Sequence, residues 1–296
     1  MSARNRISRR DMAELASELF GLGLSVGAVD AICQRASQAL AGPHEQLTAE
    51  VLGSAAVNVD ETGWRTAGEG RALWTATTPA AAILLVAEDR HRDRLEKLIG
   101  ADYAGIVCSD RWRAYDHLDP DCRQARWQHL KRDFRRHAEG LAEQGAFGEA
   151  GLELTGRLFA AWHAFAEHRD RRRLARQTKP IRAESRALVE LAARNSQRTR
   201  LHGRFARNLL KIWPALWTFV TVEGVEPTNN AAERSPRGPV IHRKLSHGTR
   251  SDDGERFVER ALTASVTCRL QGRSLFAYLA DVFSAHARGQ PLPALA

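Results

Sequence analysis

Three strand patterns in succession, followed by a helix and a fourth strand, most constrain what this chain can fold into. Apolar residues alternate along Ala55–Val59, which predicts a strand that carries Asp60 and Glu61 to a sharp turn. Further strands are predicted at Leu73–Thr77 and Ala81–Ala87. The last is apolar throughout, so we expect it to be a central strand. Glycine and proline between the patterns indicate an antiparallel meander.

The patterns after the meander indicate an α/β protein. Arg92–Ile99 has helical spacing and is closed by Gly100, and Gly105–Asp110 has the composition of a short buried strand. A further strand is predicted at Arg123–Trp127 and a basic helix at Gln128–Glu139. Strands that alternate with helices in this order predict an α/β fold with a mixed sheet and flanking helices.

A pair of helices is predicted before the first strand. Arg9–Phe20 has helical spacing, and Ser25 can cap a second helix that reaches Ala36, before Ala41–Pro43 ends the element. Such a pair could read DNA, with Arg35 as the candidate base-reading residue, or it could be a simple packing unit. Both interpretations stay open.

A second helical region begins beyond Gly151, where about 60 residues carry helical patterns and no convincing strand pattern. It leads into an apolar segment, Ile212–Val222, that we expect to pack back on the core. The chain therefore divides into four expected segments. These are a helical amino-terminal segment at 1–53, the first part of the α/β core at 54–150, a basic helical insertion at 151–222, and the rest of the core with a helical tail at 223–296.

The positive charge of the chain is concentrated in the insertion. Lys and Arg number 44 against 35 Asp and Glu, a net charge of +9, and residues 167–211 alone hold 14 basic and 4 acidic side chains. A run such as Arg169–Arg173 could be a solvated helix face, but this concentration favours contact with nucleic-acid phosphates. No apolar run approaches the roughly 18 residues of a membrane helix, and no signal peptide is recognisable. We expect a cytoplasmic protein without a membrane partner.

Three acidic residues stand out by position. Asp60 ends the first predicted strand, Asp110 ends the fourth, and Glu233 follows Asn230 at a predicted helix start. Each has an ordinary explanation, because strand ends and helix caps commonly carry acids. Two carboxylates about 4 Å apart repel by roughly 4 kcal/mol at an effective dielectric constant of about 20, so a cluster of them needs a proton or a cation. Carboxylate oxygens suit Mg²⁺ or Mn²⁺, which can activate a water or a 3′-hydroxyl against a phosphodiester.

Several longer motifs make the chain similar to a known family. From about Ile7 to Phe283 it resembles the IS66 family of DDE transposases, whose catalytic core is ribonuclease H-like. No single motif is specific, but the combination is. The motifs are Val57–Trp64 (VNVDETGW), Ser109–Tyr115 (SDRWRAY), Gln128–Phe134 (QHLKRDF), Thr228–Arg234 (TNNAAER) and His247–Arg260 (HGTRSDDGERFVER).

The resemblance implies a metal-dependent DNA strand-transfer enzyme with Asp60, Asp110 and Glu233 as its catalytic, metal-binding triad. Asp60 and Asp110 would hold two Mg²⁺ or Mn²⁺ ions jointly, and Glu233 would complete the coordination or orient the attacking water. The implied partners are double-stranded insertion-sequence ends and target DNA in the bacterial nucleoid, bound by a homodimer or higher assembly. Candidate DNA-binding residues are Lys131, Arg132, Arg234, Arg243 and Lys244, and candidate supporting residues are Glu61, His129 and Asn230.

Two other functions stay open. Family members commonly begin with a longer amino-terminal DNA-binding region, so we expect this chain to be a shortened form. A shortened copy could bind DNA without cutting it. A ribonuclease H-like nuclease with the same acids would cut DNA without joining it.

Overall fold

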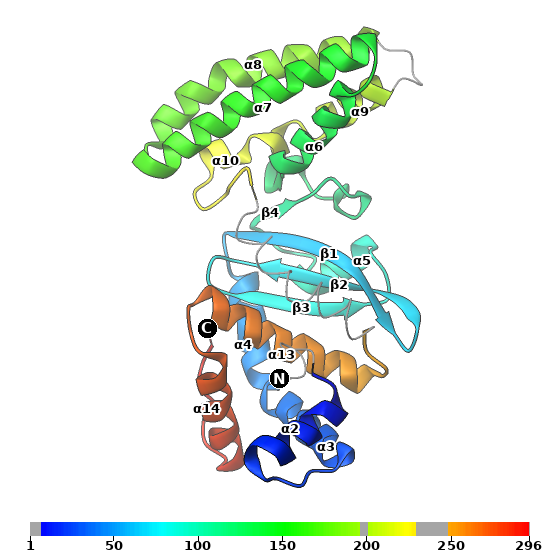
Figure 1. The fold of residues 1–296 in the computed structure, drawn as a ribbon. Coiled ribbons are helices and arrows are strands. Elements are labelled where there is room, and N and C mark those ends of the chain that lie inside the picture. Colours follow the sequence, from blue (N-terminus) through cyan, green and yellow to red (C-terminus); the bar gives the residue numbers. More distant parts are fainter. Residues whose placement is uncertain (1–6, 196–200, 229–247, 296) are drawn as a thin grey trace. The chain divides into compact units, whose positions relative to one another are not determined.

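The computed structural model describes residues 7–195, 201–228 and 248–295, and the chain forms two compact units. Unit 1 consists of Met1–Gly105 together with Asn230–Ala296, and unit 2 consists of Ile106–Asn229. Figure 1 labels most of the helices and strands of both. The segment bounds expected from the sequence, after residues 53, 150 and 222, stay a prediction.

Unit 1 is built on three antiparallel strands in the order β3-β2-β1. They are β1 (Ala56–Thr66), β2 (Glu69–Thr77) and β3 (Ala82–Ala87). Thr66 is paired with Glu69, so only Ala67 and Gly68 form the turn, with φ of 52° and 90°. Two positive φ values in a two-residue hairpin loop are those of a type I′ turn, whose twist matches that of the flanking strands. The predicted antiparallel meander is confirmed.

Two details of the predicted meander are wrong. Strand β1 does not turn after Asp60: it continues to Thr66, because β2 pairs with it residue by residue and Asp60 lies opposite Thr75. Strand β3 is not central, since it stands at the end of the order. Its apolar side chains are buried because helices α4 (Ala41–Leu52) and α13 (Asp252–Leu270) pack on it.

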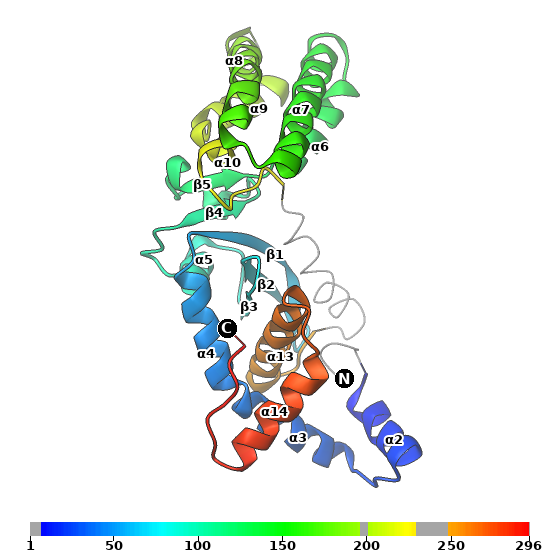
Figure 2. The same ribbon diagram turned by 90° about the vertical axis from the view of Figure 1, so that its left-hand side faces the viewer.

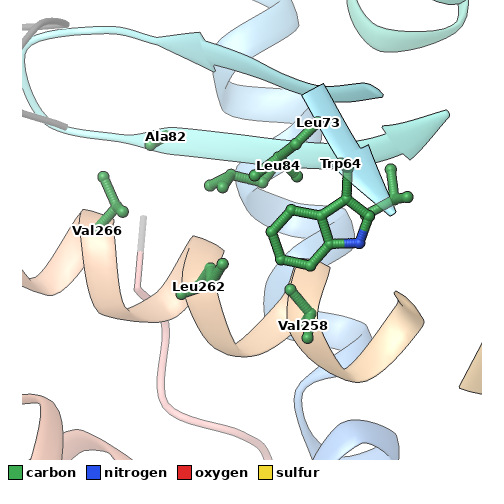
Figure 3. Close-up of a cluster of buried hydrophobic side chains, with 8 residues drawn as sticks. Trp64, Leu73, Ala82, Leu84, Val258, Leu262 and Val266 are labelled. Carbon is green, nitrogen blue, oxygen red and sulfur yellow. The ribbon is translucent and has the colours of Figure 1, made fainter. Parts of the chain in front are cut away.

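Helix α13 (Asp252–Leu270) covers one face of the three strands and also completes the edge of β3. Figure 3 shows Val258, Leu262 and Val266 of this helix pointing at Leu84 and its neighbours on the strands. Three α13 side chains spaced four residues apart accept hydrogen bonds from alternate β3 N–H groups. Val86 donates to Glu259 at 2.6 Å, Leu84 to Thr263 at 3.0 Å and Ala82 to Thr267 at 3.1 Å.

This spacing has a geometric reason. Four helical residues rise about 6 Å, and two strand residues span about 6.6 Å, so side chains at i, i+4 and i+8 stay in register with every second strand N–H group. The edge of β3 is therefore satisfied by a helix, which also blocks pairing with another chain.

The remaining helices of unit 1 are α2 (Arg9–Phe20), α3 (Val26–Ala39), α4 (Ala41–Leu52), α5 (Arg92–Ile99) and α14 (Leu275–Ala287). The predicted cap is confirmed, because the Ser25 hydroxyl accepts the Ala28 N–H at 3.0 Å. The expectation that Ala41–Pro43 ends the helical element is wrong, since α4 begins there. Pro43 fits the first turn, where its missing N–H group has no intrahelical partner to lose.

Unit 2 contains the parallel strands β4 (Ile106–Ser109) and β5 (Arg123–Ala125), followed by helix α6 (Trp127–Ala138). Short 3₁₀ turns lie at η1 (Arg113–Tyr115), η2 (Pro120–Cys122) and η3 (Pro214–Leu216). The strand that ends on Asp110 and the basic helix after it are confirmed.

Long helices make up the rest of unit 2, as the sequence predicts for the region beyond Gly151. They are α7 (Ala142–His168), α8 (Arg171–Asn195), α9 (Leu201–Lys211) and the short α10 (Thr218–Thr221), and α7, α8 and α9 lie side by side in Figures 1 and 2. Trp213, Trp217 and Phe219 are buried, which confirms that Ile212–Val222 packs on a core.

Antiparallel and parallel strand pairs flanked by helices confirm the predicted α/β class, and they are consistent with a ribonuclease H-like fold. Over the described ranges, no helix combines the length and the apolar character needed to cross a membrane.

Candidate active site

Asp110 lies where strand β4 gives way to a loop in unit 2. Val107, Cys108 and Ser109 are buried, so β4 is anchored in the core up to the residue before the acid. The Asp110 Oδ1 atom accepts a hydrogen bond from the Trp112 N–H at 2.8 Å, and the η1 turn follows. The carboxylate therefore both shapes the turn and stands at a strand end. One oxygen is used locally, which leaves Oδ2 for another partner.

Arg123 fixes the backbone beneath Asp110, a role that the sequence did not suggest. Its side chain is 1% exposed and donates to the Asp110 carbonyl at 2.5 Å, the Tyr115 carbonyl at 3.0 Å and the Ser109 hydroxyl at 3.1 Å. The guanidinium also lies 5.4 Å from the centre of the Tyr115 ring. Burial lowers the pKa of the Arg123 guanidinium, while the charges of Asp116, Tyr115 and Asp110 oppose that shift. The sequence gives no clear signal for this role, because the predicted strand Arg123–Trp127 contains two arginines and a glutamine beside only two apolar residues.

Helix α6 forms one wall of a polar groove next to Asp110. The Asp110 Oδ2 atom lies 4.0 Å from His129 Nδ1, and both residues line a cavity of about 380 Å³ with Arg132 and Arg136. Arg111 also lines the groove, where it forms an ion pair with Asp133 and lies over the Phe205 ring at 4.9 Å. The structure thus brings together Asp110, His129 and Arg132, three of the residues singled out in the sequence.

Lys131, the other basic candidate on α6, is placed differently. Its Nζ atom lies 5.7 Å from the centre of the Phe159 ring on helix α7, and its side chain is half-buried. Successive helical residues point about 100° apart, so Lys131 and Arg132 point in different directions from α6. Arg132 is the one exposed in the groove.

The start of α6 also anchors the segment that leads to Glu233. The Trp127 N–H, one of the unpaired donors at the helix start, donates to the Pro227 carbonyl at 2.9 Å, and Val225, Pro227 and Thr228 are buried. The structure describes this segment as far as Thr228. Five of the candidate residues lie outside the described residues: Asn230, Glu233, Arg234, Arg243 and Lys244.

Asp60 belongs to unit 1, in the middle of β1. Its neighbours on the strand, Val59 and Glu61, point to the opposite face, because side chains alternate along a strand. By the same alternation, Asp60 shares its face with Trp64, which packs against α13. Without the predicted turn, Asp60 and Glu61 do not point to the same side of the strand.

Two residues of the motif His247–Arg260, Gly248 and Thr249, hold the end of β1 in place. Thr249 exchanges backbone hydrogen bonds with Arg65 and Ala67, both at 2.9 Å, and its hydroxyl accepts the Trp64 indole N–H at 3.2 Å. Gly248 has φ 95°, and a Cβ atom there would come within 1.9 Å of the Arg65 carbonyl oxygen, so only glycine fits. These contacts explain the glycine and threonine of the motif by structure alone.

Part of the positive charge in the helical insertion is structural. Arg171 donates to the carbonyls of Phe219 and Val222 at 2.9 and 3.0 Å, and Arg186 lies 5.0 Å from the centre of the Trp213 ring. Exposed basic side chains of α8 remain for other partners, namely Arg172, Arg173, Arg176 and Lys179.

Asp110 can supply one of the ligands of a metal site. A hard carboxylate oxygen faces the groove, but the basic neighbours disfavour a cation held by this acid alone. Within the ranges that the structure describes, no group of three or more His, Cys, Asp or Glu side chains could hold a metal ion. Further acids are needed.

A family model described as Transposase IS66 family matches residues 8–256. The comparison with curated proteins found no match.

Proposed function

Because the chain belongs to the IS66 family of transposases, we propose that it cuts and joins DNA through Asp60, Asp110 and Glu233. The family implies DNA as the partner and polynucleotidyl transfer as the reaction. The observation that carries the residue-level proposal is the placement of Asp110. It follows a buried strand, and its Oδ2 atom opens on a groove lined by arginines.

The groove offers the two kinds of group that this reaction requires. Arg132 and Arg136 stand one helical turn apart on α6, a spacing that places both on one surface where they can hold DNA phosphates. Asp110 supplies a carboxylate next to them. On this proposal a phosphodiester enters between the arginines with its phosphorus near Asp110.

The acids would hold the divalent ions. Asp60 and Asp110 are proposed to bind two Mg²⁺ or Mn²⁺ ions jointly, and Glu233 completes the coordination or orients the attacking water. When bound, the ions would lower the pKa of a water or 3′-hydroxyl and stabilise the departing oxygen. His129, at 4.0 Å from Asp110, would orient that carboxylate.

Chain connectivity supports a place for Glu233 in this site. Thr228 is buried next to the anchored start of α6, and Glu233 follows five residues later. Five residues span at most roughly 18 Å, so the chain length between Thr228 and Glu233 permits this place. Arg234 is its neighbour in the chain and is proposed to bind DNA, as are Arg243 and Lys244. The assembly on paired DNA ends is proposed to be a homodimer or larger and to act in the bacterial nucleoid.

A strand-transfer assay tests the proposal. The substrate is linear DNA carrying the ends of the insertion sequence that encodes the chain, incubated with a target plasmid and Mg²⁺. We expect covalent joint products from the wild type and a loss of at least 100-fold with Asp60→Asn or Asp110→Asn, by analogy with the loss of other electrostatic catalytic groups. Asp93→Asn on α5 is the matched control, because Asp93 is exposed and belongs to an ordinary helix start.

The alternatives give different products. Cut DNA without joint products would indicate a nuclease, and bound but uncut DNA would indicate a non-catalytic DNA-binding derivative. Full strand transfer by Asp60→Asn protein would reject the proposed triad.

A further inference from the structure

Trp112 differs from every other tryptophan of the chain. Five of the seven are buried, and Trp162 packs at 5.1 Å and 5.7 Å from the Phe165 and Phe219 ring centres. Trp112 is 45% exposed, and among the described residues no aromatic ring stacks on its indole. Almost half of this large aromatic side chain is therefore open to a ligand.

The backbone of Trp112 is held on both sides. Its N–H donates to Asp110 Oδ1 at 2.8 Å, and its carbonyl accepts the Tyr115 N–H at 3.1 Å. Tyr115 is fully buried, with Arg123 packed on its ring. The indole is therefore presented from a fixed turn, two residues from Asp110, and not from a loose loop.

The surroundings of the indole are charged. Trp112 lines the same groove as Asp110, Arg132 and Arg136, and it is the one apolar side chain among the residues that line it. A protein-docking surface needs apolar neighbours around its aromatic anchor. An isolated aromatic ring beside arginines is the combination that binds unpaired nucleotides, with the base on the ring and the phosphates on the cations.

We propose that Trp112 is the stacking platform for an unpaired nucleobase next to the reacting phosphate, and that Arg132 and Arg136 hold the phosphates of the same strand. This inference rests on the proposed function, because it takes the groove of Asp110 to be the place where DNA reacts. It makes the substrate a strand whose base is unpaired at that point, since a base inside a duplex has no free face for the ring.

The test measures binding without chemistry. Wild type, Trp112→Ala, Trp112→Phe and Leu141→Ala are titrated in EDTA with a short fluorescent single-stranded oligonucleotide, and with an otherwise identical strand that is abasic throughout. Leu141 is the matched control, an apolar side chain in the same unit that is 90% exposed. Stacking of one base is lost in Trp112→Ala, so its affinity for the normal strand should fall about 5- to 150-fold.

The other measurements separate stacking from general damage. Trp112→Phe should recover most of the affinity, Leu141→Ala should bind like the wild type, and all four proteins should bind the abasic strand equally. Trp112→Ala with wild-type affinity, or with the same loss on abasic DNA, would overturn the inference. The strand-transfer assay keeps the two proposals apart. If the wild type joins DNA and Trp112→Ala binds the oligonucleotide normally, the stacking role alone is rejected. If the wild type does not join DNA, the proposed function is rejected.

Discussion

At the scale of single residues, the placement of Asp110 was predictable and its support was not. A short apolar run that ends on an acid indicates a carboxylate at a strand end, and β4 confirms it. The supporting role of Arg123 was not predictable. The sequence does not show that this charged side chain of β5 is buried against Ser109 and Asp110. Trp112 was missed for a similar reason, since exposure cannot be read from an isolated tryptophan.

Replacing Arg123 should damage both stability and reaction. Arg123→Met keeps the length of the side chain but leaves the Asp110 and Tyr115 carbonyls without their donor, at a cost of about 1–3 kcal/mol for each buried unpaired group. Denaturant unfolding and the strand-transfer rate measure the two effects. Arg113→Met, a change of an exposed arginine in the η1 turn, should alter neither. Equal stability of Arg123→Met and wild type would contradict the buried-support role.

At the scale of elements, hydrophobic periodicity located the strands and helices. It did not predict where β1 ends or which element covers β3. The alternation that predicts β1 stops being regular at Asp60, yet pairing with β2 carries the strand to Thr66. The apolar run of β3 suggests a central strand, but α13 buries it at an edge. Periodicity reports burial, and it does not distinguish a neighbouring strand from a covering helix.

The edge of β3 predicts how stability depends on pH. Burial raises the pKa of Glu259 to about 7, although the Val86 N–H bond opposes the shift. A carboxyl group whose folded pKa lies above its unfolded value favours folding below the unfolded pKa, and this contribution is lost as pH rises through the folded pKa. The free energy of unfolding should therefore fall between about pH 4.5 and pH 7, by up to roughly 3 kcal/mol from this group.

Glu259→Gln is the test of that pH dependence. Its amide oxygen can still accept the Val86 N–H but does not titrate, so urea unfolding at pH 5 and pH 7.5 should show a smaller difference than in the wild type. Glu69→Gln, which changes an exposed acid on β2, should keep the wild-type difference. The same pH dependence in Glu259→Gln and wild type would mean that Glu259 is not the group responsible.

At the scale of the whole molecule, the α/β class and the family were accessible from the sequence, but the division of the chain into two compact units was not. Asp60 lies in unit 1 and Asp110 in unit 2, and the family match covers both. The excess charge of the helical insertion was also only partly informative. Arg171 and Arg186 hold the fold together, so a count of basic residues overstates the surface left for DNA.

The central claim is that Asp60, Asp110 and Glu233 form one metal site, and counting bound Mn²⁺ by electron paramagnetic resonance tests it most directly. The full chain is measured on DNA carrying the ends of its insertion sequence, beside Asp60→Asn, Asp110→Asn, Glu233→Gln and the control Asp93→Asn. We expect two bound ions per active site in the wild type and the control, and the loss of at least one ion in each of the three other variants. Unchanged Mn²⁺ binding in Asp60→Asn or Asp110→Asn protein would contradict the shared site.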